Sequence, residues 1–277
     1  MLHLSKRQLN HLYPRLLQLG NFNLYTYGAL AAVGLIVGLS LIVYLAKRDG
    51  IDEENTWNVG LVSIVAGVIG AKLLLVINDW AYYSHHLRDI FSFNVFQAGG
   101  VYSGALVVGT ATGIAFMRWK RMPLLRSLDA FAPGVAIGQA IGRLGCFAAG
   151  CCYGKPTSAP WAVTFTNPLA AQVVGTPLGI PLHPTQLYEF LADIAIFALL
   201  IWMGRHRRFA GQIAGTFAFL YGIARFFIEF YRDDPERGSV FGGLMSLTQL
   251  LAVCFVILGG LLWMRHSEES PGKLEAA

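Results

Sequence analysis

The residues best suited to chemistry in this chain are charged side chains embedded in long apolar stretches. Arg143 stands in such a stretch, which begins near Leu128. Glycines at 134, 138 and 142 recur every four residues ahead of it, so we expect one helix face of bare backbone that can approach neighbouring helices closely. A charge in a membrane span costs roughly 2.5–3.5 kcal/mol on insertion scales unless a partner or ligand offsets it. An arginine that reaches up to the membrane interface would be purely structural. A cation fixed among helices instead indicates a site for an anion.

A second embedded arginine lies on a patterned helix face. Four polar residues share that face, because their spacing is i, i+4, i+8 and i+11. They are Tyr221, Arg225, Glu229 and Arg232. Glu229 is therefore placed to neutralise Arg225 or Arg232. The pattern is compatible with a structural ion pair that locks the helix, and also with an anion site in which Glu229 holds a functional arginine in place.

The elements that position these residues are predicted to be membrane-spanning helices. Of the 277 residues, 55% are hydrophobic and 13% are charged, and the mean hydropathy is +0.52, whereas soluble domains carry about 25% charged residues. We predict an all-α integral membrane protein that forms a single domain over residues 1–277. Seven apolar stretches approach the ~20 residues that a bilayer-spanning helix needs. These stretches are residues 24–45, 57–78, 96–117, 128–150, 185–203, 210–231 and 244–264.

The basic residues of the connecting segments predict the orientation of the helices. If the N-terminus is outside and the C-terminus is cytoplasmic, eleven lysines and arginines fall on the inner side and seven on the outer side. The two short basic loops 118–121 and 205–208 both lie inside in this arrangement, as the positive-inside rule expects. The tail 265–277 is then cytoplasmic.

Two segments outside the apolar stretches have their own expected structure. Residues 1–22 carry leucines at positions 9, 12, 16 and 19, which predict a short helix lying at the membrane interface. Residues 151–183 contain five prolines and little charge, and we expect them to form a small ordered head on the outer face.

With this orientation, three cations fall at one depth. Lys72, Arg143 and Arg225 each follow the inner start of a stretch by 14 or 15 residues, which is about 21–23 Å at ~1.5 Å per residue. Polar residues at the outer ends of the inward-running stretches join the same layer. They are Tyr27, Gln97, Tyr102, Ser103, Gln186, Tyr188, Glu189, Ser246, Thr248 and Gln249. Three cations in one layer favour a phosphate over a proton path or a cation channel. Asp193 lies deeper, and neither a partner nor a role is predicted for it.

Net charge and cysteine spacing argue against nucleic-acid, metal and cofactor sites. The net charge of +5 is spread over loops and does not indicate nucleic acid as a partner. Cys146, Cys151 and Cys152 have a spacing unlike the usual zinc patterns, and cysteine often serves as a small buried apolar residue. We therefore predict neither a metal nor a cofactor site. His183, just before Pro184, is expected to be a capping or packing residue.

Short blocks along nearly the whole chain carry a family resemblance. The blocks are Tyr25-Thr26-Tyr27-Gly28, Gly70-Ala71-Lys72, residues 99–106, Ile141-Gly142-Arg143-Leu144-Gly145, residues 183–189, residues 221–232, and Met245-Ser246 with Gln249. In this order they resemble blocks of the bacterial prolipoprotein diacylglyceryl transferases. The resemblance implies transfer of the diacylglyceryl group of phosphatidylglycerol to the lipobox cysteine of a prolipoprotein signal peptide. It also implies a site near the outer leaflet of the bacterial cytoplasmic (inner) membrane.

The resemblance and the polar layer together assign roles to individual residues. By the family's pattern, Arg143 and Arg225 hold the phosphate, and Glu229 and Tyr27 support them. Ser103 joins the catalytic set. The layer adds four residues expected to bind phosphatidylglycerol alongside the two arginines: Lys72, Tyr102, Gln186 and Arg232.

Departures from the family's pattern affect the expected proton acceptor. The signature usually carries two asparagines and a glutamate where this chain has Cys146, Ala149 and Cys151, and Ser103 stands where histidine or tyrosine is common. The substrate thiol, with an ordinary pKa near 8.5, therefore lacks its usual candidate base. Either another group takes the proton, or the neighbouring cations lower the thiol pKa.

Two alternatives to this transferase remain open. One is a family member that binds lipid without catalysis or with altered specificity. The other is a membrane thiol oxidoreductase built on the three cysteines, although no Cys-X-X-Cys pair is present. A retinal protein is excluded, because residues 244–264 contain no lysine for a Schiff base.

Overall fold

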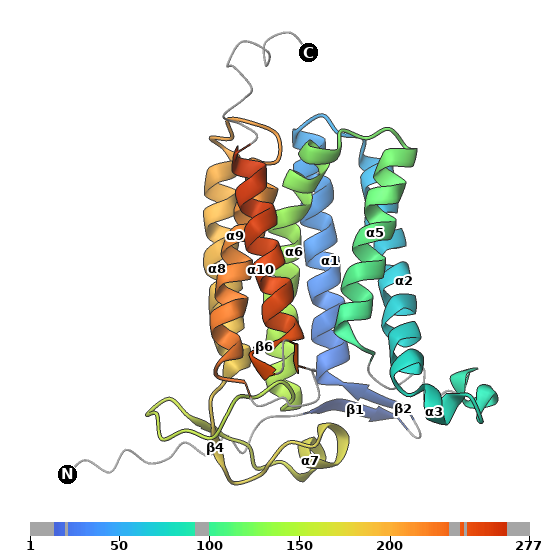
Figure 1. The fold of residues 1–277 in the computed structure, drawn as a ribbon, viewed down its shortest axis with the longest axis vertical. Helices are drawn as coiled ribbons and strands as arrows, with labels where there is room; N and C mark the ends of the chain where they lie inside the picture. The colour runs from blue at the N-terminus through green and yellow to red at the C-terminus, as the bar shows by residue number, and fades with distance from the viewer. Residues whose placement is uncertain (1–13, 20–21, 92–99, 233–238, 241–242, 265–277) are drawn as a thin grey trace. The chain divides into compact units, whose positions relative to one another are not determined.

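Long helices cover each of the seven apolar stretches (Figure 1). The computed structural model describes residues 14–19, 22–91, 100–232, 239–240 and 243–264, so residues 96–99 of the third stretch and the tail 265–277 lie outside the described residues. The long helices are α1 (Thr26–Arg48), α2 (Glu53–Asn78), α5 (Tyr102–Trp119), α6 (Leu124–Ala149), α8 (Thr185–Gly204), α9 (Gln212–Glu229) and α10 (Leu247–Met264). The predicted all-α class is confirmed.

Four of these helices, α1, α2, α8 and α10, are long and apolar enough to cross a membrane. The other three carry glycines and embedded charges, which lower their hydropathy: Arg118 in α5, Arg143 in α6 and Arg225 in α9. The four apolar helices support the prediction of an integral membrane protein. The chain divides into two compact units, one made of Met1–Ile42 with Leu128–Ala277 and the other of Val43–Ser127.

In the first unit, α1 and α6 pack backbone against backbone. A methyl group at Gly34 would lie 2.6 Å from the carbonyl oxygen of Gly138, and one at Gly134 would lie 2.6 Å from that of Gly38. Side chains at these positions would separate the helices, so the bare face expected on α6 is confirmed at Gly134 and Gly138. The expectation is wrong for Gly142, where an added methyl group would meet no atom within 4 Å.

A buried aspartate of α6 fixes the start of α9. Asp129 accepts hydrogen bonds from the backbone N–H groups of Gly211 (2.7 Å), Ile213 (2.9 Å) and Ala214 (2.9 Å), and Arg207 lies 3.6 Å from its carboxylate. A carboxylate here satisfies backbone donors that a helix start leaves unpaired and complements the positive end of the helix dipole. Beside this contact, Ala132, Ile196, Leu200 and Ile213 form an apolar core that joins α6, α8 and α9.

The segment between α6 and α8 is an ordered head. It contains a two-stranded sheet of β3 (Val163–Thr164) and β4 (Pro181–Leu182), together with helix α7 (Pro168–Val174). Asn167 caps the start of α7 through its side chain, and Gly175 ends it in a left-handed conformation. Phe165 and Leu182 form its buried core, against which Phe147 of α6 packs. The expectation of an ordered head between these helices is met by this segment.

The interfacial helix expected near the N-terminus is wrong over its described part. Residues 15–19 form strand β1 (Arg15–Leu19), which pairs antiparallel with β2 (Phe22–Tyr25), and Leu17 faces Leu24. The leucine spacing resembled a helix, but the sequence Gly20-Asn21 between two apolar stretches is also a hairpin signal. Leu9 and Leu12 lie outside the described residues. A second short hairpin, β5 (Ser239–Val240) with β6 (Met245–Ser246), precedes α10.

The second unit is centred on the pair α2 and α5. These helices also meet through glycines, because a methyl group at Gly70 would lie 2.5 Å from the carbonyl oxygen of Gly104. The backbone N–H of Val101 donates to the carbonyl of Ala71 (3.1 Å), so the start of α5 lies beside the second half of α2. The short helices α3 (Trp80–Tyr83) and η1 (Leu87–Phe91) complete this unit among the described residues.

Candidate active site

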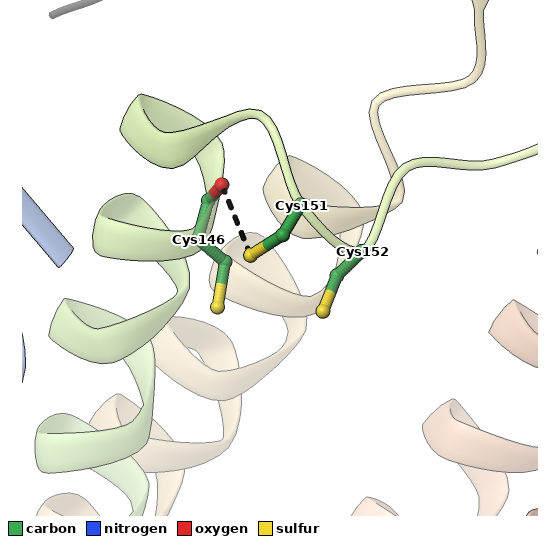
Figure 2. A group of neighbouring side chains, drawn as sticks. All are labelled: Cys146, Cys151 and Cys152. Carbon is green, nitrogen blue, oxygen red and sulfur yellow. Dashed lines mark hydrogen bonds between the residues drawn. The ribbon is translucent and has the colours of Figure 1, made fainter. Parts of the chain in front are cut away.

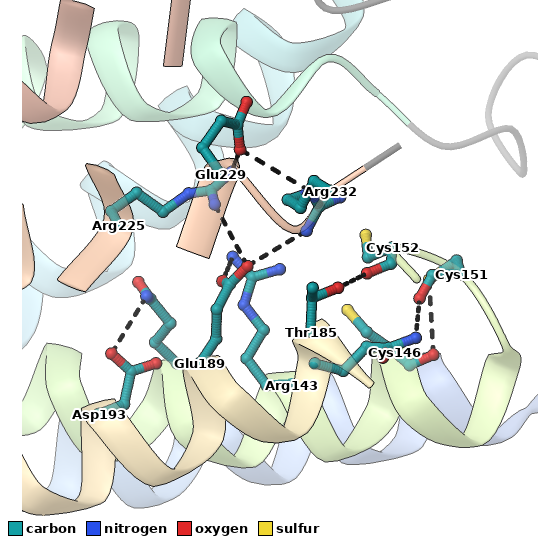
Figure 3. A network of polar contacts seen from close by, with 12 residues as sticks. Arg143, Cys146, Cys151, Cys152, Thr185, Glu189, Asp193, Arg225, Glu229 and Arg232 are labelled. Atoms are coloured by element: carbon teal, nitrogen blue, oxygen red, sulfur yellow. Dashed lines mark hydrogen bonds and ion pairs between the residues drawn. The ribbon is translucent and has the colours of Figure 1, made fainter. Parts of the chain in front are cut away.

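The first unit contains a buried arginine–glutamate cluster at one end of its helices. The ends of α6 and α9 and the starts of α8 and α10 lie together there (Figure 1). The cluster consists of Arg143, Glu189, Arg225, Glu229 and Arg232 (Figure 3). These residues come from α6, from α8, and from α9 with the turn that follows it.

Glu189 is the centre of the cluster. Its Oε2 lies 2.5 Å from Nη2 of Arg143, and its Oε1 lies 3.1 Å from Nη1 of Arg232 and 3.5 Å from Nη1 of Arg225. The Glu189 side chain is only 3% exposed. One buried carboxylate thus holds three guanidinium groups from different parts of the chain, which makes their burial tolerable.

Glu229 forms a second, weaker centre. Its Oε2 lies 2.8 Å from Nη2 of Arg225 and 3.9 Å from Nε of Arg232. The Ser246 hydroxyl donates to the other carboxylate oxygen at 3.0 Å. Ser246 in turn forms reciprocal hydrogen bonds with Gln249 at the start of α10, a capping arrangement that fixes the hydroxyl. The predicted neutralisation of Arg225 and Arg232 by Glu229 is confirmed.

The charges of the cluster do not cancel. Three arginines and two glutamates leave one net positive charge in a buried setting. Buried cations attract an anion more strongly than exposed ones, because the local dielectric constant is low. Asp193, one turn along α8 from Glu189, is buried and accepts a hydrogen bond from Gln139 at 3.4 Å. Gln139 is thus a partner for Asp193 that the sequence did not predict. The cluster is suited to hold a singly charged anion such as a phosphodiester.

The structure places the predicted site residues in two groups. Arg143, Arg225, Glu229 and Arg232 come together in the cluster. Glu189, which contacts the three arginines, was predicted only as one of the polar residues at the depth of the three embedded cations. Tyr27 lies in the first turn of α1, in the same unit. A methyl group added at Gly145 of α6 would lie 3.3 Å from the backbone carbonyl oxygen of Tyr27, so the two helices are close at this point. The Tyr27 side chain is 47% exposed.

Gln186 makes a structural contact, and its predicted contact with the lipid stays a prediction. Its amide donates to the carbonyl oxygen of Cys151 at 2.7 Å, and the residue is completely buried. Its Oε1 has no hydrogen-bond partner among the residues that the structure describes. Gln186 therefore positions the turn after α6.

The remaining predicted residues lie in the second unit. Lys72 follows Ala71 on α2, and Ala71 accepts the hydrogen bond from Val101 at the start of α5. Tyr102 and Ser103 occupy the first turn of α5, so the three residues share one level of this unit. That they complete the site around Arg143 stays a prediction.

The head connects to the turn that carries Arg232. Gly154 donates its backbone N–H to His183, and Lys155 donates to the carbonyl of Tyr231 at 2.8 Å. The His183 ring packs edge-on against Tyr231 and bonds the Tyr188 hydroxyl at 2.9 Å. His183 is a packing residue, as predicted. The head therefore holds the Arg232 turn in place.

Three cysteines gather beside the cluster (Figure 2). The sulfur atoms of Cys146, Cys151 and Cys152 all lie within 4.8 Å of one another, although the residues are spread over seven positions. Cys146 is buried and the other two are half-buried. Among the described residues, these are the side chains that could hold a metal ion.

Comparison with known proteins identifies the family. The sequence profile of the prolipoprotein diacylglyceryl transferases matches residues 14–265 of this chain. The chain belongs to the prolipoprotein diacylglyceryl transferase family. A family protein from Clostridium tetani, named phosphatidylglycerol–prolipoprotein diacylglyceryl transferase, is 34% identical over 249 residues, which cover 89% of this chain and 94% of the relative.

Further relatives carry the same name. A Clostridium perfringens protein, whose name adds the number 2, is 34% identical over 240 residues, 86% of this chain and 89% of its own length. A Synechocystis protein is 31% identical over 259 residues, 91% of this chain and 89% of its own length. The family matches extend over both units, so they cover every predicted site residue.

Proposed function

We propose that the protein transfers the diacylglyceryl group of phosphatidylglycerol to the thiol of the lipobox cysteine in prolipoprotein signal peptides. The observation that carries this proposal is the cluster of three buried arginines in a chain of the prolipoprotein diacylglyceryl transferase family. Relatives over nearly the same length are named for this reaction. The activity is that of an enzyme of bacterial lipoprotein maturation.

The chemistry matches the charge of the cluster. The phosphodiester of phosphatidylglycerol carries one negative charge, equal and opposite to that of the cluster. When the thiolate attacks the glyceryl carbon, the carbon–oxygen bond breaks and glycerol phosphate leaves with a second negative charge. Arginines fixed around that phosphate stabilise the new charge, and one well-placed donor is worth roughly 3–4 kcal/mol. Arg143 and Arg225 take this role, Glu189 and Glu229 hold them, and Arg232 completes the anion site.

The proposed setting is the bacterial inner membrane. All seven long helices cross the bilayer, with the N-terminus outside and the C-terminus in the cytoplasm. The cluster and the head then lie on the outer side, at the level of the outer-leaflet headgroups. In this arrangement the lipid reaches the arginines without leaving the bilayer, and Lys72, Tyr102, Ser103 and Tyr27 contribute to the same site.

Transfer is tested with the purified protein in phosphatidylglycerol vesicles and a peptide that carries a lipobox cysteine. We expect a diacylglyceryl peptide by mass spectrometry, and release of glycerol phosphate in equal amount. A peptide with serine at the lipobox position is the matched control and should remain unmodified. Lipid binding without product would instead indicate a family member that binds phosphatidylglycerol without catalysis.

A further inference from the structure

The three cysteines are grouped as metal ligands would be, although their spacing in the sequence did not predict a metal site. Cys146 lies in the last turn of α6, and Cys151 and Cys152 lie in the turn that follows. Their sulfur atoms lie within 4.8 Å of one another. Three thiolates bound to one zinc ion at 2.3 Å are roughly 3.8 Å apart in tetrahedral geometry. The separations of the three sulfur atoms, at most 4.8 Å, exceed that value by no more than about 1 Å.

Two buried side chains of α8 hold the turn that carries the thiols. Thr185 donates its hydroxyl to the carbonyl of Cys152, and Gln186 donates its amide to the carbonyl of Cys151, each at 2.7 Å. Both residues are completely buried. The carbonyl of Cys146 accepts the backbone N–H of Cys151 at 3.2 Å, which closes the turn back on α6. The thiols thus sit on a fixed support, as metal ligands require.

The backbone at Cys152 is held in an unfavourable conformation. Its φ of +62° lies in the left-handed region, which residues with a side chain rarely adopt because Cβ then crowds the following carbonyl oxygen. Only one other non-glycine residue in the described chain, Arg121, has a positive φ. A glycine or asparagine would adopt this conformation more easily. Strain of this kind often occurs where a side chain must be aimed at a functional site.

The thiols face the arginine–glutamate cluster. Arg143 lies one turn before Cys146 on α6. Figure 3 shows the cysteines at the side of the network occupied by Arg143 and Arg232. A metal ion at the thiols would therefore lie next to the proposed phosphate site.

We propose that Cys146, Cys151 and Cys152 bind a zinc ion whose fourth position takes the thiol of the prolipoprotein cysteine. This inference rests on the proposed function and explains how the substrate thiol can lose its proton although the usual candidate base is missing. Catalytic zinc sites keep three protein ligands and one open position. A thiol that binds zinc loses its proton outright.

The bonds and charges of the proposed step balance. The substrate thiol binds zinc and releases its proton to water. The bound thiolate then attacks the glyceryl carbon, so a sulfur–carbon bond forms and the carbon–oxygen bond to phosphate breaks. The electron pair of that bond stays on the phosphate oxygen, and glycerol phosphate leaves with the extra charge. No oxidant or reductant takes part.

The first test measures zinc in the purified protein after growth with added Zn²⁺. We expect about one zinc ion per chain in the wild type, and its loss in Cys146→Ala, Cys151→Ala and Cys152→Ala. Cys254 is an exposed cysteine of α10 outside the site, so Cys254→Ala is the matched control and should keep its zinc. Absence of zinc from the wild type, or a disulfide between two of the three thiols by intact mass, would overturn the proposal.

The second test observes the open position directly. Co²⁺ in place of zinc should give thiolate charge-transfer absorption, which should increase when the lipobox peptide adds a fourth thiolate. The serine peptide should leave the spectrum unchanged. If the cysteine peptide also leaves it unchanged, the substrate thiol does not bind the metal and the proposal fails.

Activity separates this inference from the proposed function. We expect chelation to slow transfer by at least about tenfold, within the range seen when metal sites are disturbed, and added Zn²⁺ to restore it. Full transfer by the triple alanine variant without zinc would overturn the proposed role of zinc in transfer and leave the transferase function intact. Stoichiometric zinc that binds the peptide thiol, in a protein that transfers nothing, would leave the metal site intact and overturn the proposed function.

Discussion

At the scale of single residues, Glu189 holds the arginine–glutamate cluster together. Its carboxylate contacts Arg143, Arg225 and Arg232, and all of these side chains are largely buried. Without a carboxylate at this position, the three guanidinium groups would face one another with only Glu229 to compensate. Removing one partner of a buried ion pair leaves an uncompensated charge, which is among the most destabilising of single changes.

Glu189→Gln is therefore expected to destabilise the protein by about 3–5 kcal/mol. The amide keeps the shape of the side chain but removes the charge that offsets the arginines. The unfolding midpoint in detergent, followed by heating, measures the effect. Glu54→Gln changes an exposed glutamate at the start of α2 and serves as the control. Equal midpoints for both variants would mean that Glu189 does not hold the arginines.

The sequence predicted the arginines and Glu229 as cluster residues, but it did not predict that Glu189 is the centre. The spacing of Arg225, Glu229 and Arg232 on one helix is a local property, so their contacts could be predicted. Glu189 lies near the start of α8, and its three partners are 36 to 46 residues distant along other elements. Only the approach of α6, α8 and α9 at one end brings these residues together. Cys146, Cys151 and Cys152 are close in sequence, but the turn that brings their sulfur atoms together is held by hydrogen bonds from Thr185 and Gln186 of α8, which the sequence did not reveal.

At the scale of elements, glycines determine how closely the helices approach. Residues 34 and 38 of α1 meet residues 138 and 134 of α6 without side chains between them. The four-residue glycine spacing on α6 predicted this face, but not where it ends. Gly142 belongs to the same spacing, but a methyl group added there would meet no atom within 4 Å. A sequence pattern identifies a face of a helix, whereas the contact itself depends on the partner's position.

Two substitutions on α6 compare a glycine that contacts α1 with one that does not. Gly134→Ala is expected to destabilise the protein by about 1–3 kcal/mol, because the methyl group would overpack against the backbone of α1. Gly142→Ala is the matched control and should be neutral or stabilising by up to about 1 kcal/mol, since alanine favours helix and meets no obstacle. Unfolding in the same detergent compares the two. A larger loss from the Gly142 variant would contradict the packing of α1 on α6.

The N-terminal hairpin shows why some elements were mispredicted. Leucines at 16 and 19 fit a helix, and a short segment contains too few residues to separate the two periodicities. Pairing with β2 supplies the backbone hydrogen bonds that a helix would have formed internally. The pairing depends on the partner strand, so local leucine spacing was a poor guide.

At the scale of the whole molecule, the proposed site requires one orientation in the membrane. The cluster lies at the end of α6, α8, α9 and α10 where the head is attached, and phosphatidylglycerol of the outer leaflet reaches it only if that end is outside. The basic loop 205–208 lies between α8 and α9, away from the cluster in sequence. Its positive charge favours the cytoplasmic side.

Reporter fusions test this orientation. A reporter fused after Arg208 should be active only as a cytoplasmic enzyme, whereas one inserted within residues 156–177 of the head should be active only outside. The two sites lie at opposite ends of α8, so each is the control for the other. The reverse pattern would place the cluster on the cytoplasmic side and remove the proposed access from the outer leaflet.

The central claim is that buried arginines stabilise the phosphate that leaves phosphatidylglycerol. The rate of glycerol phosphate release, measured with a lipobox peptide for Arg225→Ala and Arg126→Ala, tests it most directly. Arg126 is an arginine in the first turn of α6 and lies outside the cluster. We predict that Arg225→Ala loses about 10²–10³-fold in rate with the protein still folded, while Arg126→Ala keeps the wild-type rate. Equal rates for the two variants would contradict the claim.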